Sequence, residues 1–293
     1  MIDLVTDDFE KIVQRCLYYC ADETFAENLG NLRKIVQELD RGTYVAPPAP
    51  ISFNPASSGH VPDRGYVIGY IPRSGSTLLA VTLTNLTYKG FACLGYPGEI
   101  FNLDQIPARA RHYGCRSLDD YARWALWEST DESGLFAVKG DLFQLLPFLF
   151  VPTFQRLMAN IKFVYLTRED VLLQAISLVI AHHTGRWTSE SAVDGTFSGD
   201  VDEIAANVRM LTQMMASWET VFAFSGVRPL RLTYEELEAN VNACVRKIAS
   251  HVDVLLPPGG FDAEVTLMPT RNENNYEMAR RAIARLGVTS TVL

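Results

Sequence analysis

The feature that most constrains this chain is the segment at 66–77, which reads Tyr-Val-Ile-Gly-Tyr-Ile-Pro-Arg-Ser-Gly-Ser-Thr. An apolar, β-prone run ends at Pro72 and a helix-like run follows Thr77, so the segment predicts a strand, a tight turn and a helix. The first N–H groups of a helix lack intrahelical partners and carry partial positive charge. With Gly75 in the turn, the segment therefore predicts a cradle for an anion, most naturally a phosphate.

Side chains of the same turn add further donors. Arg73 contributes a positive charge, and hydroxyl groups follow at Ser74, Ser76 and Thr77. The turn is not a Walker A loop, because Ser76 occupies the position of that motif's lysine and the upstream Gly69 lies one residue too far away. Nucleoside-triphosphate hydrolases need this lysine for the β- and γ-phosphates, so the sequence disfavours ATP hydrolysis.

Composition limits the partners and the compartment. The 293 residues carry a net charge of −8, so we expect no extended basic face and no nucleic-acid partner. The five cysteines are scattered and odd in number, which predicts neither a disulfide framework nor a metal site. The acidic N-terminus does not resemble a signal peptide, and the apolar run at 143–154 contains prolines and is too short to cross a bilayer. We therefore expect a cytoplasmic protein without a transmembrane segment.

Periodicity and proline content divide the chain. Helical spacing over 8–40 and a following proline-rich stretch predict a small helical appendage at 1–45, a linker at 46–61 and a main domain at 62–293. Strands are expected at 65–71, 90–94, 135–138, 161–166 and 228–233. Helices are expected at 77–86, 141–160, 170–183, 201–224, 235–252 and 275–286, with another helix capped by Ser117.

Strands that alternate with helices predict an α/β fold with a central, mostly parallel sheet and helices on both faces. Ligands of such sheets bind at the carboxyl ends of the strands. Arg73, Lys139 and Arg168 each follow an expected strand, so we expect these three cations near one rim of the sheet.

Five motifs follow one another in the main domain. They are Pro-Arg-Ser-Gly-Ser-Thr at 72–77, Gly-Tyr-Pro-Gly-Glu-Ile-Phe at 95–101, Leu-Thr-Arg-Glu-Asp at 166–170 with Gln-Ala-Ile-Ser-Leu at 174–178, Thr-Gly-Arg-Trp at 184–187, and Leu-Thr-Tyr-Glu-Glu-Leu at 232–237. Their order and spacing resemble the sulfotransferase superfamily, and most closely the Stf0 (trehalose 2-sulfotransferase-like) family.

The resemblance implies a P-loop-like three-layer sandwich and a PAPS-dependent sulfotransferase, where PAPS is 3′-phosphoadenosine-5′-phosphosulfate. It matches 72–77 to the loop that holds the phosphosulfate, which assigns donor binding to Arg73, Ser74, Gly75, Ser76 and Thr77. It matches Arg168 and Ser177 to the groups that hold the 3′-phosphate, and a polar tail beginning at Arg271 to a segment that closes over the donor. The implied reaction moves a sulfuryl group to a hydroxyl of a carbohydrate, glycolipid or other small acceptor and releases PAP, without a metal.

A doubly anionic donor needs two anion sites, and two strand-to-helix turns on neighbouring strands supply them. Glu99 is the expected base, because it follows the second expected strand in a Gly/Pro turn and matches the family's proposed catalytic glutamate. Lys139 is expected to stabilise the leaving group or a sulfuryl oxygen, and Arg73 is assigned to catalysis as well. His182 and His183 are rival bases.

Several alternatives stay open on sequence grounds. Trp187 could stack on the adenine, line the acceptor site or fill the core. A P-loop kinase of a small metabolite would require the Walker lysine that Ser76 replaces. A non-catalytic relative that binds PAP or another nucleotide would retain donor binding without Glu99. The helices at 1–45 could dock a partner, form a homo-oligomer or cover the acceptor pocket.

Overall fold

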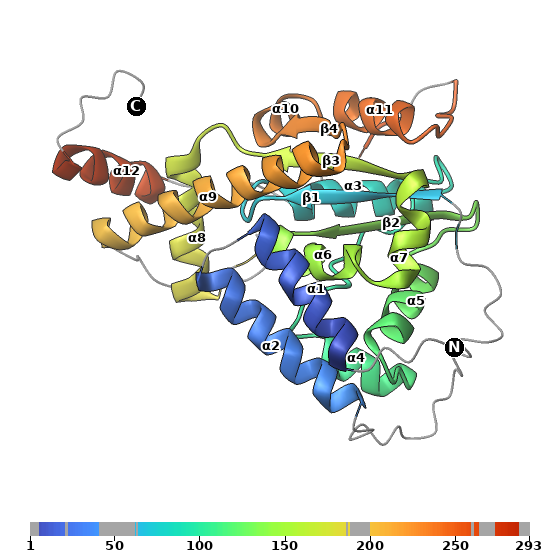
Figure 1. The fold of residues 1–293 in the computed structure, drawn as a ribbon. Coiled ribbons are helices and arrows are strands. Elements are labelled where there is room, and N and C mark those ends of the chain that lie inside the picture. Colours follow the sequence, from blue (N-terminus) through green and yellow to red (C-terminus); the bar gives the residue numbers. More distant parts are fainter. Residues whose placement is uncertain are drawn as a thin grey trace.

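The computed structural model of the chain describes residues 6–20, 23–40, 62, 64–185, 187, 200–258, 261–263 and 273–286. Four strands form one sheet, namely β1 (Arg64–Tyr70), β2 (Leu135–Gly140), β3 (Ile161–Thr167) and β4 (Leu230–Thr233). Their order across the sheet is β2-β1-β3-β4, and each neighbouring pair is parallel. The predicted α/β fold with a central parallel sheet is therefore confirmed (Figure 1).

β1 occupies the interior of the sheet because its side chains suit a strand that is covered on both faces. All of its residues after Arg64 are buried, as in other parallel strands that read as nearly continuous apolar runs. Gly69 is required by close packing, since a Cβ atom there would lie 2.7 Å from ring carbons of Trp218. The strands expected at 65–71, 135–138, 161–166 and 228–233 are all present, with ends that shift by one or two residues.

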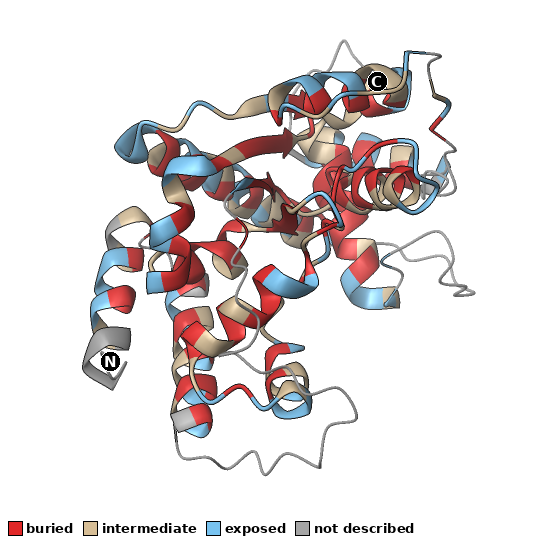
Figure 2. Ribbon diagram, turned by 90° about the vertical axis from the view of Figure 1, so that its right-hand side faces the viewer, coloured by how far each residue is buried: buried red, intermediate tan, exposed pale blue. Residues whose placement is uncertain are grey.

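Helices cover both faces of this sheet. One face packs against α3 (Ser76–Tyr88), α10 (Tyr234–Ala239) and α11 (Val241–His251), with Tyr66 and Ile68 of β1 in the shared core. The other face packs against α6 (Leu142–Leu149) and α9 (Val201–Ser225). Figure 2 shows the buried strands between these layers of helices.

The first two helices, α1 (Thr6–Tyr19) and α2 (Glu23–Asp40), pack onto the layer formed by α6 and α9. Phe25 stacks on Phe143 with 5.3 Å between ring centroids, and Ser217 donates a hydrogen bond to the buried Cys20 sulfur at 3.4 Å. Their apolar faces thus belong to the same core as that side of the sheet. The division into appendage, linker and main domain stays a prediction, since 46–61 lie outside the described residues.

The prediction of a strand at 90–94 is wrong. Ala92 and Leu94 are buried, but the segment is irregular, and the bridge to β2 comes after it, between Gly98 and Val138. Contacts outside a ladder take the segment's N–H groups, because those of Phe91 and Ala92 donate to the carbonyl of Leu86 and that of Leu94 donates to Thr87 Oγ1 at 3.1 Å. An N–H group that is bonded in this way is not available for a regular strand pairing.

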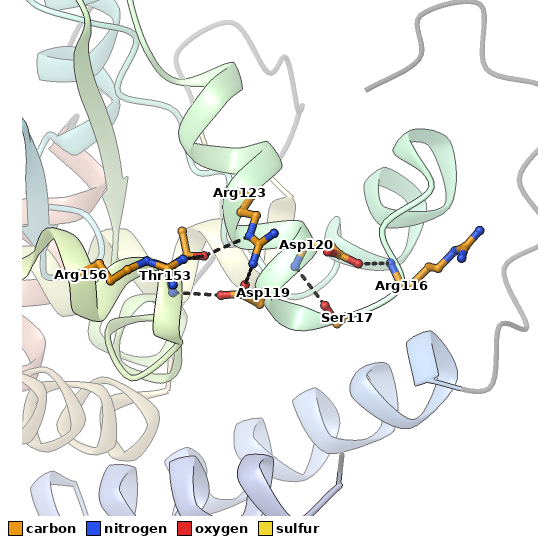
Figure 3. A network of polar contacts seen from close by, with 7 residues as sticks. All are labelled: Arg116, Ser117, Asp119, Asp120, Arg123, Thr153 and Arg156. Carbon is orange, nitrogen blue, oxygen red and sulfur yellow. Dashed lines mark hydrogen bonds and ion pairs between the residues drawn. The ribbon is translucent and has the colours of Figure 1, made fainter. Parts of the chain in front are cut away.

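A polar network joins the helices beside β2 and is drawn in Figure 3. The buried Asp119 in α5 (Leu118–Glu128) accepts the backbone N–H of Thr153 in α7 (Pro152–Leu157) at 2.9 Å and a guanidinium N–H of Arg123 at 2.7 Å. Ser117 accepts the N–H of Asp120 at 3.0 Å, which confirms the predicted helix cap. The network fixes α5 against α7, which leads into η1 (Met158–Asn160), while α4 (Ile106–Tyr113) packs against α2.

Two further helices complete the described part of the chain. α12 (Glu273–Leu286) buries Met278, Ala279 and Ala282 against α8 (Val171–Thr184) and α9. In the described residues no single helix is both long and apolar enough to cross a membrane. α6 and the helical segment Pro152–Asn160 together have the length and composition of a membrane-crossing segment, but they are bent by 81° relative to each other.

Candidate active site

The turn between β1 and α3 has the geometry expected of an anion cradle. Arg73 and Gly75 both take left-handed backbone conformations, with φ of 66° and 83°. A Cβ atom at position 75 would lie 2.7 Å from a ring carbon of Tyr234, so this glycine is needed for both conformation and space. Within the part of the chain that the structure describes, no side chain caps the start of α3 at Gly75. The first N–H groups of α3 are therefore available to a bound anion.

The turn between β3 and α8 differs from the first one. Asp170 caps α8 by accepting the N–H of Leu173 at 2.8 Å, and Glu235 accepts the N–H of Glu169 at 3.1 Å. Carboxylates thus already satisfy this helix start, which the sequence had led us to expect as a second anion cradle. Positive charge at this turn comes from the side chain of Arg168, which is only 6% exposed and lies over the ring of Tyr234 at 4.8 Å.

The two turns lie against each other because β1 and β3 are neighbours. Arg73 Nε donates to Ser177 Oγ of α8 at 3.0 Å, and Gln174 Nε2 donates to the carbonyl of Pro72 at 2.6 Å. Burial lowers the pKa of Arg73, and the positive charge of Arg168 lowers it further. Two adjacent like charges in a partly buried turn favour an anion between them.

Next to the first turn, two side chains converge on Glu99. Its Oε1 atom accepts hydrogen bonds from Tyr70 Oη and Lys139 Nζ, each at 2.7 Å. Lys139 Nζ also donates to Thr77 Oγ1 in the first turn of α3, at 3.3 Å. Lys139 lies within β2 rather than just after it, and its side chain is 7% exposed, against 30% for Glu99.

The surroundings of Glu99 set its protonation. Burial alone would raise the pKa of Glu99, but the charge of Lys139 and hydrogen bonds from Lys139, Tyr70 and Asn102 bring it below its ordinary value. Burial raises the pKa of Asp141, the N-cap of α6, to about 6, and the negative charge of Glu99 adds to the rise. Glu99 is therefore an ionised carboxylate at neutral pH, held by one ammonium and one phenol.

Comparison with known proteins bears on the second turn. The model of the Stf0 sulphotransferase family matches residues 142–281. Over this part of the chain the protein is similar to the Stf0 sulphotransferase family. The resemblance predicted from the sequence is thereby confirmed, and it implies a transferase that moves a sulfuryl group. No curated protein matches the chain significantly.

The Stf0 match covers part of the site. Arg168, Gln174 and Ser177 lie inside it, whereas the turn at 72–77, Glu99 and Lys139 precede it. The hydrogen bonds between Arg73 and Ser177 and between Gln174 and Pro72 join these two portions.

The remaining predicted residues have different surroundings. The carbonyl of Trp187 accepts a hydrogen bond from Arg73 Nη1 at 2.6 Å, so the Thr-Gly-Arg-Trp motif contacts the first turn. His182 lies edge-on to the Trp187 ring at 5.4 Å, and His183 Nε2 lies 2.9 Å from a carboxylate oxygen of Glu203 on α9. Arg271 lies outside the described residues. Within the described residues no cluster of three or more His, Cys, Asp or Glu side chains could hold a metal ion.

A pocket of about 530 Å³ opens beside Glu99. Its lining combines aromatic, charged and hydroxyl side chains: Tyr88, Tyr96, Glu99, Arg109, Trp127, Glu128 and Thr130 are among them. Tyr88 and Trp127 are 74% and 43% exposed, so this pocket presents aromatic surface to a bound molecule.

Three features of the site were not predicted from the sequence: the hydrogen bond from Tyr70 to Glu99, the hydrogen bond from Gln174 to the first turn, and the aromatic side chains that line the pocket. The signal for Tyr70 was a hydroxyl-bearing residue at the carboxyl end of the central strand. Gln174 precedes Ser177 by three residues, so both lie on one face of α8. Tyr96 and Trp127 carried no signal, since their proximity depends on the path of the irregular segment before Glu99.

Proposed function

We propose that the chain is a PAPS-dependent O-sulfotransferase that moves a sulfuryl group from PAPS to a hydroxyl of a carbohydrate, glycolipid or other small acceptor and releases PAP. The observation that carries the proposal is the contact between the two turns, in which Arg73 donates to Ser177 at 3.0 Å. Two cationic turns on neighbouring strands suit a nucleotide with an anionic group at each end. The Stf0 match over the second turn supports the same reading.

The residues present fit such a donor. Ser74 is fully buried in the first turn, and its Oγ atom has no hydrogen-bond partner within the described residues. A phosphosulfate at this turn would be held by the first N–H groups of α3 and by the hydroxyls of Ser74, Ser76 and Thr77. The 3′-phosphate would be held by Arg168 and Ser177, with Arg73 between the two anionic groups. Arg271 is retained as a proposed donor contact from the family resemblance.

Transfer requires loss of a proton from the acceptor hydroxyl and stabilisation of negative charge on the leaving phosphate. Glu99 is ionised and partly exposed, so it can accept that proton, a contribution of about 10²–10⁴-fold in rate for a positioned base. Lys139 reaches the first turn through Thr77, and Arg73 lies within the turn itself. These two cations would stabilise the charge that develops on the bridging and sulfuryl oxygens.

The pocket beside Glu99 is the proposed acceptor site. Sugar rings present a flat apolar face that packs on aromatic side chains, and their hydroxyls need polar partners at the edge. Tyr96 and Trp127 offer the first kind of surface, and Arg109, Glu128 and Thr130 offer the second. The exposed aromatic side chains of this pocket support a ring-bearing acceptor.

The test is turnover of PAPS with a panel of mono- and disaccharides and glycolipids, measured as release of PAP and formation of a sulfate ester. The protein should turn over with at least one hydroxylated acceptor, and Glu99→Gln should lower kcat by about 10²-fold or more while PAP still binds. The control variant Glu132→Gln changes an exposed carboxylate that does not line the pocket and should retain most of the rate of transfer. Binding of PAP without turnover of any acceptor would favour the non-catalytic alternative, and absence of PAP binding would overturn the proposal.

A further inference from the structure

Lys139 lies between the proposed base and the proposed donor turn. Its ammonium is 2.7 Å from Glu99 Oε1 and 3.3 Å from Thr77 Oγ1, in the first turn of α3. The ammonium also lies over the ring of Tyr70, with 5.2 Å between Nζ and the ring centroid. One buried positive charge is thus shared between a carboxylate and the place where a donor anion would bind.

We propose that Lys139 couples donor binding to the base. A sulfuryl group at the first turn of α3 attracts the Lys139 ammonium toward Thr77 and weakens its contact with Glu99. The Glu99 carboxylate then accepts a proton more readily once the donor is bound. This inference rests on the proposed function. It adds an order to the reaction, in which the donor binds before the base becomes fully effective.

The local geometry allows the ammonium to move while the carboxylate stays. A lysine ammonium is a compact charge on a flexible four-carbon stem, so a small rotation changes which oxygen it favours. Tyr70 donates to the same Oε1 atom from β1, and Arg109 holds the backbone of Glu99 by donating to its carbonyl at 3.3 Å. These two contacts fix Glu99 when the Lys139 contact weakens.

The other groups that face Glu99 do not bridge to the donor turn in the same way. Within the described residues they are Tyr70 from β1, Asn102 from the following loop, and Asp141 from the start of α6. Lys139 is the group among these that also hydrogen-bonds the first turn of α3. Removing its charge from Glu99 takes away the first of the interactions that hold the pKa of Glu99 down.

Coupling between two sites is reciprocal. If the donor weakens the contact between Lys139 and Glu99, then the negative charge of Glu99 must weaken donor binding, because it competes for the same ammonium. Glu99→Gln should therefore tighten PAPS binding, and the gain should depend on the presence of Lys139.

The experiment is a double-mutant cycle on the Kd of PAPS, measured by isothermal titration without acceptor for the wild type, Glu99→Gln, Lys139→Met and the double variant. Glu99→Gln should tighten PAPS binding about threefold or more in the wild type and clearly less in the Lys139→Met protein, as expected for residues in contact. Glu132→Gln, the control variant, should leave the Kd nearly unchanged. Additive effects of the two substitutions would overturn the coupling.

A second measurement uses the wild-type protein, in case a variant fails to fold. The 13C carboxyl signal of Glu99, titrated with and without PAPS, should show a higher pKa in the PAPS-bound protein, and a smaller rise with PAP, which lacks the sulfuryl group. An unchanged midpoint, or equal rises with both nucleotides, contradicts the coupling. If PAPS does not bind the wild type at all, the proposed function fails and the coupling with it, whereas PAPS binding with an additive cycle overturns the coupling alone.

Discussion

Arg73 and Ser177 are 104 residues apart in the chain, yet the Nε atom of the first donates to the Oγ atom of the second at 3.0 Å. This contact ties the turn that follows β1 to the helix that follows β3. It also orients a guanidinium whose other end donates to the carbonyl of Trp187. A single hydroxyl in α8 thus positions a cation of the neighbouring turn.

Ser177→Ala removes this anchor, and we expect PAP binding to weaken about five- to tenfold, because the hydrogen bond to a charged donor and the proposed phosphate contact are both lost. Thermal stability should change little. The matched control is Ser225→Ala at the exposed end of α9, where the hydroxyl bonds only local carbonyls and the loop N–H of Val227. Equal PAP affinity for both variants would contradict a role for Ser177 in the site.

Gly75→Ala should abolish measurable PAP binding and lower the free energy of unfolding by about 1–3 kcal/mol, because the position needs a positive φ and has no room for a Cβ atom. Gly226→Ala separates the two causes, since φ there is 69° but nothing lies within 4 Å of the added atom. The measurement is chemical denaturation with isothermal titration of PAP. A loss at position 75 no greater than at position 226 argues against the steric contact with Tyr234.

The sequence predicted the four strands of the sheet and the strand-turn-helix order of the first turn, and the reasons are local. An apolar run, a proline and a Ser-Gly-Ser stretch specify strand, turn and helix through contacts between near neighbours. Arg73, Lys139 and Arg168 were expected near one rim because parallel strands end at the same edge, and hydrogen bonds and charge interactions link their surroundings. Lys139, however, lies within β2.

Other features depend on contacts that no local pattern records. The stretch at 90–94 has strand-like composition, but the N–H groups of Gly90, Phe91 and Ala92 donate to carbonyls at the end of α3 and that of Leu94 donates to Thr87 Oγ1, instead of to a ladder. The start of α8 was expected to hold an anion, but Asp170 and Glu235 occupy its N–H groups. Glu235 is distant in sequence, so its approach to the start of α8 could be seen only in the fold.

Lys139→Met should raise the pKa of Glu99, because the ammonium that favours the ionised carboxylate is removed. In the wild type the pKa of Glu99 lies below its ordinary value, so activity carried by its ionised form should persist as pH falls and be lost only below the usual glutamate range. In the variant the acid limb of kcat/KM should move to higher pH by about one unit or more. The measurement is the pH dependence of kcat/KM over the acid limb. Lys162→Met, at an exposed ion pair with Asp253, should leave the limb in place.

Trp127→Ala should raise the KM for the acceptor about three- to tenfold and leave the Kd of PAP unchanged, because the side chain lines the pocket beside Glu99 that is the proposed acceptor site. Steady-state kinetics at saturating PAPS and titration with PAP separate the two effects. Phe224→Ala, an exposed aromatic on α9, is the control. An unchanged KM would place the acceptor elsewhere.

Asp119→Ala should lower the free energy of unfolding by about 1–3 kcal/mol, because it leaves the N–H of Thr153 and the guanidinium of Arg123 without their carboxylate (Figure 3). Asp120→Ala removes an exposed carboxylate contact to the N–H of Arg116 and should cost much less. Denaturant titration measures both. PAP affinity should be nearly the same in the two folded variants, and a large loss in Asp119→Ala would show that this network acts on the donor site.

The most direct test of the central claim, that two neighbouring turns hold opposite ends of one nucleotide, is isothermal titration of the protein with PAP and with 5′-AMP, which lacks the 3′-phosphate. We predict one site, PAP at least about tenfold tighter than 5′-AMP, and loss of that preference in Arg168→Gln, in line with a charge-assisted phosphate contact. Equal affinities for the two nucleotides, or no binding of PAP, would contradict the account.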